Sequence, residues 1–149
     1  MTRDEQFMRR ALELAEMAAS EGEVPVGCVV TWGNEIVGEG YNRREGDKNA
    51  LRHAELIAIE RACEALDGWR LHGCEMFVTL EPCPMCAGAA INARISRVVF
   101  AALDPKAGAL ISRVMLFDHG FNHKPEVMYG LMERESAILL GEFFLNLRK

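Results

Sequence analysis

The sequence lacks any run of about 18 consecutive apolar residues, which is the length that a helix needs to cross a membrane. Its first twenty residues also lack the apolar core of a signal peptide, and their charges are spaced as on an amphipathic helix. Positive charge is scarce, because 17 lysines and arginines stand against 22 acidic residues and give a net charge of −5. We therefore expect a cytoplasmic protein without a membrane partner, and not a basic protein that coats nucleic acid in general.

Cysteine is sparse as well. The five cysteines are an odd number without the spacing of a small disulfide-bonded scaffold, so no disulfide framework is expected in this compartment. Cys28, Cys63 and Cys74 lie in apolar or mixed stretches, where we interpret them as small packing residues. Cys83 and Cys86 are three positions apart, with prolines before and between them, and need a separate explanation.

The order of the expected strands and helices predicts an α/β fold. No repeat, low-complexity tract or linker interrupts the chain, so we expect a single domain over residues 1–149. Two apolar runs around Trp32-Gly33-Asn34 predict a β-hairpin, and apolar residues at spacings of three and four predict an amphipathic helix before it. Strands are predicted over residues 24–31, 35–41, 75–81, 97–102 and 126–130, and helices over 4–20, 52–66, 84–95 and 131–149. The alternation of strands with helices favours a mixed sheet of about five strands with helices on both faces.

Two short motifs fall at the starts of two of these helices. Cys83 and Cys86 come where a strand ends and a helix begins, a place that stabilises thiolates and can turn both sulfur atoms toward one point. His53 and Glu55 stand thirty positions upstream, in the stretch His53-Ala54-Glu55-Leu56. In a regular helix, residues two apart point to opposite faces. His53 and Glu55 can therefore serve one site only if His53 lies at the helix boundary, and we predict that it does.

One histidine and two cysteines are a suitable ligand set for a catalytic zinc ion, with a fourth position left for water. Glu55 would not be a ligand. Zinc lowers the pKa of its bound water to about 7, and a carboxylate beside that water can take its proton and deliver it to a leaving group. His53, Cys83, Cys86 and Glu55 therefore predict hydrolysis at an electron-poor carbon, such as a ring carbon that carries an amino group.

The cysteine pair has two other interpretations. A Cys-x-x-Cys pair that opens a helix after a strand also fits a thioredoxin-like dithiol, but that site has no use for His53 and Glu55, and Pro82 stands where an aromatic residue is usual. A structural zinc site needs a fourth cysteine or histidine at close spacing. His72 and Cys74 are the nearest candidates for it.

The His-Ala-Glu and Pro-Cys-x-x-Cys motifs together resemble those of the zinc deaminases. The segments EVPVGCVV, GEGYN, GWRLHGCEMFVTLEPCPMCAGAAINARISRVVFAALDPKAG, FNHKPEV and FFLNLRK extend the resemblance, in order, to the bacterial tRNA-specific adenosine deaminases. This resemblance implies a cytidine-deaminase-like three-layer α/β/α domain with one zinc ion per subunit, and a homodimer. It also implies that the substrate is the wobble adenosine of a tRNA anticodon stem-loop, which is flipped into the pocket and converted to inosine.

The resemblance also assigns roles to single residues. Asn42 would bind the flipped nucleotide, although an ordinary turn residue is the alternative. The backbone N–H of Ala54 would face the edge of the base. Asp104 and Lys106 would contact the nucleotide before the target, and Asn122 and His123 would lie near the RNA. Of the aromatic pair Phe143 and Phe144, one would stack near the flipped-out neighbours, and core packing is the alternative for both.

The nature of the substrate depends on the surface around the pocket. We hypothesise that the basic residues Arg43, Arg44, Arg52, Lys106, Arg113, Lys124, Arg148 and Lys149 form one RNA-binding face. The chain departs from the family pattern in the stretch NALRHAE, in the loop AGALISRVML and in its short basic end, all of which are near the expected RNA. The alternative function is a zinc deaminase of a free base or nucleoside, of the guanine or cytidine type, with no RNA partner.

Overall fold

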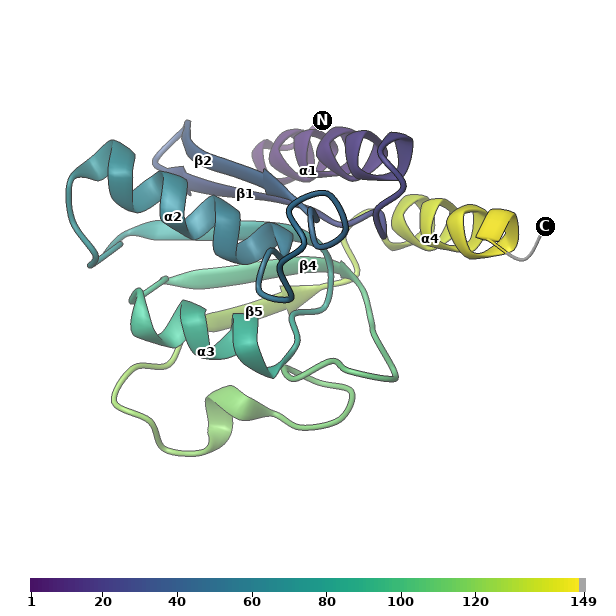
Figure 1. Cartoon of the computed structure of the whole chain (residues 1–149). Coiled ribbons are helices and arrows are strands. Elements are labelled where there is room, and N and C mark those ends of the chain that lie inside the picture. Colours follow the sequence, from purple (N-terminus) through teal and green to yellow (C-terminus); the bar gives the residue numbers. More distant parts are fainter. Residues whose placement is uncertain (148–149) are drawn as a thin grey trace.

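Five strands form one mixed sheet in the computed structural model, which describes residues 1–147 (Figure 1). The strands are β1 (Gly27–Trp32), β2 (Glu35–Tyr41), β3 (Cys74–Leu80), β4 (Arg97–Ala102) and β5 (Glu126–Tyr129), in the spatial order β2-β1-β3-β4-β5. β1 pairs antiparallel with β2 and β3, whereas β3, β4 and β5 are parallel to one another. The predicted mixed five-stranded sheet is confirmed.

Helices cover both faces of this sheet and complete three layers. α1 (Arg3–Ser20) and α4 (Glu133–Leu147) lie on one face, and α2 (Ala54–Leu66) and α3 (Pro84–Asn92) lie on the other (Figure 1). Along β3 the side chains alternate, so that Met76 and Val78 pack toward α2 and α3 while Phe77 packs toward α1. The predicted three-layer α/β/α arrangement is therefore confirmed. None of the helices in residues 1–147 combines the length and the apolar character that crossing a membrane requires.

Close packing of α2 on β2 sets the position of the His-Ala-Glu motif. Gly40 of β2 has no room for a side chain, because a Cβ atom there would overlap with the backbone carbonyl oxygen of Ala54. A glycine at this point of the strand lets the first turn of the helix approach the sheet directly. The beginning of α2 is thereby fixed against the end of β2, just before Asn42.

Several predicted boundaries differ from the structure, and three of these differences have a clear physical reason or bear on the site. The first strand begins at Gly27 and not at residue 24, because Pro25 has no N–H group to donate and Val26 turns back to Val24 with a hydrogen bond of 2.8 Å. The second helix begins two residues later than predicted, at Ala54. The third ends at Asn92 and does not reach residue 95, since Arg94 adopts a left-handed backbone with a φ of 65°.

The cysteines outside the motif have the packing role that the sequence predicts. Cys28 and Cys74 are fully buried in the core between the sheet and α2 and α3, and Cys63 packs against the same core. All five cysteines are free thiols. Arg148 and Lys149, two of the basic residues expected to bind RNA, lie outside the described residues.

Candidate active site

The starts of α2 and α3 meet beside the carboxyl end of β3. His53 directly precedes α2 and has an extended backbone, with φ −78° and ψ 152°. Cys83 has the same place before α3, with φ −75° and ψ 174°, and Pro84 occupies the first helical position, where its missing N–H costs nothing. The prediction that His53 lies at the helix boundary is confirmed, and this geometry lets His53 and Glu55 face the same site.

Three side chains converge there as a group that can hold a metal ion. The ligand atoms of His53, Cys83 and Cys86 all lie within 4.8 Å of one another. His53 Nδ1 is 3.7 Å from Cys83 Sγ and 3.5 Å from Cys86 Sγ. Tetrahedral zinc with its usual bond lengths separates a nitrogen ligand from a sulfur ligand by about 3.5 Å. The donor atoms and their spacing therefore fit zinc.

The ionisation of the two cysteines also favours the binding of a cation at this site. A hydrogen bond from Cys86, together with His53, lowers the pKa of Cys83 to about 4 despite partial burial. The same hydrogen bond and burial raise the pKa of Cys86, so that one thiolate is shared by the pair. The interaction with Cys83 raises the pKa of His53. A thiolate at the start of a helix is a strong ligand for a soft or borderline metal ion.

Glu55 lies in the first turn of α2 and lines the same cavity as His53 and Cys83, a cavity of about 200 Å³. It is 4% exposed, and burial raises the pKa of its carboxyl group to about 7. A carboxyl group with a pKa near neutrality can both take and give a proton at physiological pH. Glu55 is therefore placed and tuned as an acid and base beside the three ligand side chains.

Asn42 lies against the beginning of α2 and lines the same cavity. Its Oδ1 atom accepts a hydrogen bond of 2.9 Å from the backbone N–H of Ala54. That N–H group, which was predicted to face the edge of a base, is therefore engaged by Asn42 within the chain. Because the side-chain oxygen is used in this way, the NH₂ group of Asn42 is the part of the amide left to meet a ligand.

Two further hollows adjoin the cavity. An apolar groove of about 380 Å³ is lined by Leu103, Lys106, Leu140 and Phe144, and it shares Val24, Leu80 and Asp104 with the cavity. A third hollow, of about 300 Å³, includes Asn42, Arg44 and Phe143. The last helix thus reaches the site through its aromatic pair, with Phe144 45% exposed. The space around Glu55 therefore continues into two neighbouring hollows.

Comparison with known proteins identifies the family. Residues 1–102 match the family described as the cytidine and deoxycytidylate deaminase zinc-binding region. The tRNA-specific adenosine deaminase of Bacillus subtilis is 45% identical over 150 residues, which cover 100% of this chain and 93% of that protein. The one from Haemophilus influenzae is 43% identical and covers 98% of this chain and 86% of that protein. The chain belongs to the tRNA-specific adenosine deaminase family.

Solved structures of deaminases have the same fold. A structure from a study of A-to-I editing by tRNA:A34 deaminases at the wobble position superposes with a TM-score of 0.88 at 43% identity, covering 91% of this chain and 99% of that chain. The protein NE0047, solved in complex with 2,6-diaminopurine, superposes with a TM-score of 0.74 at 26% identity, covering 94% of this chain and 80% of that chain. The predicted cytidine-deaminase-like fold is confirmed.

Membership of this deaminase family, whose matched region binds zinc, decides between the interpretations of the cysteine pair. The thioredoxin-like interpretation is wrong, because His53 joins Cys83 and Cys86 in one ligand group. The structural-zinc interpretation is also wrong, since His72 and Cys74 lie at the beginning of β3 whereas the ligand group follows its end.

Not all the residues that the family resemblance assigned to RNA come to the cavity. His123 accompanies Asn122 in the loop before β5, and its Nε2 atom is 2.7 Å from the carbonyl oxygen of Ile95. Glu126 at the start of β5 is paired with Arg97 at the start of β4, so this loop lies at the edge of the sheet opposite the cavity. Within one chain, Asn122 and His123 are thus remote from Glu55, and their contact with RNA stays a prediction.

The structure places two of the basic residues at different ends of the sheet, and a single RNA-binding face stays a prediction. Lys124 lies at that same opposite edge and pairs with Asp118 at 2.7 Å, whereas Lys106 follows the carboxyl end of β4. Two parallel strands begin at one edge and end at the other, which is the reason for the separation. Arg43 pairs with Glu21 and Asp47, Arg52 pairs with Asp47 and Glu60, and Arg113 is exposed in the loop before residues 116–118. Among the described residues, Arg44 and Lys106 line the site and form no ion pair.

Two buried carboxylates near the site were missed from the sequence. Glu23 is 3% exposed and accepts hydrogen bonds from the backbone N–H groups of Glu45 and Gly46, in the loop that follows Asn42. Glu81 is 2% exposed and accepts several backbone hydrogen bonds from the loop that follows β4. The position of Glu81 between a strand and the cysteine motif was the only feature of the sequence that could have indicated its role. A glutamate at such a position is also typical of an ordinary loop.

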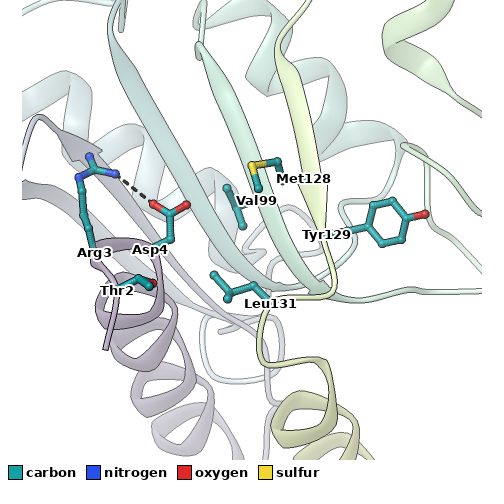
Figure 2. Close-up of a pocket in the computed structure, with 7 residues that line it drawn as sticks. All are labelled: Thr2, Arg3, Asp4, Val99, Met128, Tyr129 and Leu131. Atoms are coloured by element: carbon teal, nitrogen blue, oxygen red, sulfur yellow. Dashed lines mark hydrogen bonds and ion pairs between the residues drawn. The ribbon is translucent and has the colours of Figure 1, made fainter.

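A separate pocket of about 310 Å³ lies between the start of α1 and strands β4 and β5. Figure 2 shows Arg3 and Asp4 on one side of it and Val99, Met128 and Leu131 on the other. Its charged residues are satisfied within the chain, because Asp4 pairs with Arg97 at 2.9 Å and Arg3 pairs with Glu75 at 2.8 Å. This pocket has no part of the metal-ligand group, so the chemistry belongs to the cavity at Glu55.

Proposed function

We propose that this protein converts adenosine to inosine at the wobble position, A34, of a tRNA anticodon. The proposal is supported by full-length similarity to tRNA-specific adenosine deaminases from two bacteria. The observation that carries it is the combination of two neighbouring spaces. The cavity at Glu55 suits one flipped base, and the groove beside it offers Phe144 and Lys106 to the next nucleotide.

In this proposal His53, Cys83 and Cys86 hold one zinc ion. When bound, the ion lowers the pKa of a water molecule to about 7 and makes it a nucleophile at neutral pH. Glu55 takes the proton of the attacking water and passes it to N1 of adenine as the oxygen adds to C6. Glu55 then carries the second proton to the departing amino group, so that adenosine and water give inosine and ammonia.

The other residues around the cavity bind and orient the RNA. The NH₂ group of Asn42 is directed to the flipped nucleotide, because its oxygen already accepts from Ala54. Phe144 offers an exposed ring on which a base can stack. Lys106 and Arg44, which form no ion pair among residues 1–147, are available to phosphate oxygens. Asp104 stands between the cavity and the groove, where it would meet the nucleotide before the target.

The proposal includes the assembly and the setting of the enzyme. Residues 1–149 act as a single zinc-dependent deaminase domain, which pairs with a second copy and works in the cytoplasm on tRNA. Size-exclusion chromatography with light scattering tests the homodimer. A mass of one chain, 16.6 kDa, would contradict it.

The decisive experiment uses the zinc-loaded protein and an anticodon stem-loop with adenosine at the wobble position. The product is digested to nucleosides and inosine is measured by chromatography, with guanine and free cytidine tested in parallel. We expect inosine from the stem-loop alone. The Glu55→Gln variant, which keeps the size of the side chain but cannot carry the proton, should lose about 10²- to 10⁴-fold in turnover while still binding zinc. Ammonia from guanine or cytidine, with the stem-loop unchanged, would instead support a small-molecule deaminase.

A further inference from the structure

Glu81 joins the cysteine motif to the loop that follows β4. It stands two residues before Cys83, and its carboxylate is almost completely buried. One oxygen, Oε1, accepts from the backbone N–H of Asp104 at 2.9 Å. The other, Oε2, accepts from the N–H groups of Leu110, Ile111 and Ser112 at 3.1, 2.8 and 2.9 Å, and the Ser112 hydroxyl also donates to the carboxylate.

The loop is wrapped closely around this carboxylate. A Cβ atom at Gly108 would overlap with the carboxyl group of Glu81, so the backbone can pass there only without a side chain. The N–H of Ala109 donates to the carbonyl oxygen of Pro82 at 2.8 Å, which adds a second attachment one residue further along the motif. Residues 103–112 contain no strand or helix of their own, so these attachments replace a hydrogen-bonded ladder.

The residues held in this way form one wall of the site. Asp104 and Ala107 line the cavity at Glu55, and Lys106 lines the groove beside it. Asp104 Oδ1 accepts in turn from the N–H groups of Lys106 and Ala107, at 3.0 and 3.3 Å, so its own anchoring by Glu81 is passed to both. The same short segment, Glu81 to Cys83, therefore sets both the start of α3 and the course of the wall.

We propose that Glu81 is a positioning residue, which fixes the loop of residues 103–112 against the cysteine motif so that the loop receives the nucleotide beside the target base. The binding of a nucleotide by this loop rests on the proposed function. The attachment of the loop by Glu81 does not depend on it. Both oxygens of Glu81 only accept hydrogen bonds here. A glutamine would turn an NH₂ group toward backbone N–H groups and leave buried donors unpaired.

The test compares three variants that alter the attachment of the loop from different sides. Glu81→Gln changes the acceptor, Gly108→Ala pushes the loop off the unchanged carboxylate, and Ser112→Ala removes one hydroxyl donor. Ile95→Val is the control, because it trims a fully buried side chain at the opposite edge of the sheet. For each variant we would measure zinc content, melting temperature, hydrogen exchange of residues 104 and 110–112, and KM and kcat with the anticodon stem-loop.

We expect Glu81→Gln and Gly108→Ala to keep one zinc ion and to speed exchange at residues 104 and 110–112 by about tenfold or more. Their KM should rise by about tenfold while kcat changes less, since the wall binds a neighbouring nucleotide in the ground state and the transition state alike. Ser112→Ala should give a smaller change in the same direction. Ile95→Val should leave KM and the exchange of the loop unchanged, even where its loss of melting temperature equals that of Glu81→Gln.

Unchanged exchange in the loop of Glu81→Gln would overturn the proposal, as would a rise in KM of equal size in the Ile95→Val control. Loss of zinc from Glu81→Gln with normal loop exchange would also overturn it, because Glu81 would then serve the metal ligands alone. If the wild-type protein makes no inosine, the proposed substrate fails. Hydrogen exchange, which needs no substrate, then still decides whether Glu81 holds the loop.

Discussion

The side-chain oxygen of Asn42 accepts a hydrogen bond of 2.9 Å from the backbone N–H of Ala54, and both residues are buried. The first N–H groups of a helix have no partner within the helix and need a capping acceptor. His53, which precedes α2, supplies no such bond from its side chain, because its ring faces the two cysteines. Asn42 thus caps the helix from a neighbouring loop, and its NH₂ group is left for the cavity.

The first prediction separates these two roles of Asn42. Asn42→Asp keeps an acceptor for Ala54 but loses the donor, so its melting temperature should stay close to that of the wild type. Its kcat/KM with the anticodon stem-loop should fall about 10- to 100-fold, since a buried acceptor on the base is left unpaired. Asn42→Ala should lose activity and also about 1 kcal/mol of stability, as the removal of a cap does. Wild-type activity in Asn42→Asp would show that the amide does not donate to the substrate.

The metal centre was predictable from the sequence because its geometry is local. A cysteine pair three apart at a helix start, and a histidine at another start, are positions where a few residues determine the direction of each side chain. The sheet was predictable for the same reason, since short apolar runs such as those of β1 and β3 are a local pattern. Boundaries were less predictable, because the end of α3 depends on the left-handed backbone of Arg94.

The surroundings of the metal centre depend on contacts between distant segments, which periodicity does not report. The separation of Lys106 from Lys124 is one example, because the sequence does not show that the two lie at opposite edges of parallel strands. Glu81 was overlooked for a related reason. A buried carboxylate is identified by its hydrogen-bond donors, and most of these lie about thirty residues further along the chain. Contacts between loops that are distant in the sequence are visible only in the structure.

The second prediction concerns removal of the metal. Treatment with a chelator should abolish turnover and lower the melting temperature, and added zinc should restore both. The physical reason is that folding brings His53, Cys83 and Cys86 together, so an ion that binds only the folded chain stabilises it. Differential scanning fluorimetry with and without chelator measures the shift.

Cysteine variants give the control for this experiment. Cys83→Ala should contain less than one zinc ion and show no further shift with the chelator, whereas Cys63→Ala should bind zinc as the wild type does. Cys63 packs at the edge of the core on α2 and takes no part in the ligand group. An equal chelator shift in Cys83→Ala and the wild type would remove Cys83 from the metal site.

The third prediction concerns the exposed ring of Phe144, which lines the groove beside the cavity. Phe144→Ala should weaken binding of the anticodon stem-loop by about 1 to 3 kcal/mol, the usual contribution of one stacked base. Phe144→Trp should retain most of the affinity, and Phe144→Leu should not, because leucine keeps apolar area without an aromatic face. Leu145→Ala is the control, since Leu145 is 57% exposed and lines none of these hollows. Equal binding by the leucine and tryptophan variants would show that the groove offers apolar contact only.

The last prediction uses two lysines at opposite edges of the sheet. Lys106 follows β4 beside the groove, whereas Lys124 precedes β5 and is paired with Asp118. Lys106→Glu should weaken binding of the stem-loop and lower the slope of log K against log salt by about 0.7 to 0.9 for each phosphate that the protein no longer neutralises. Lys124→Glu has the same change of charge, but it should leave the affinity and the slope nearly unchanged. At about 150 mM salt the Debye length is about 8 Å, so a charge at the opposite edge is screened from RNA in the groove. Equal losses in the two variants would instead mean that RNA reaches both edges, as the predicted contact with Asn122 and His123 requires.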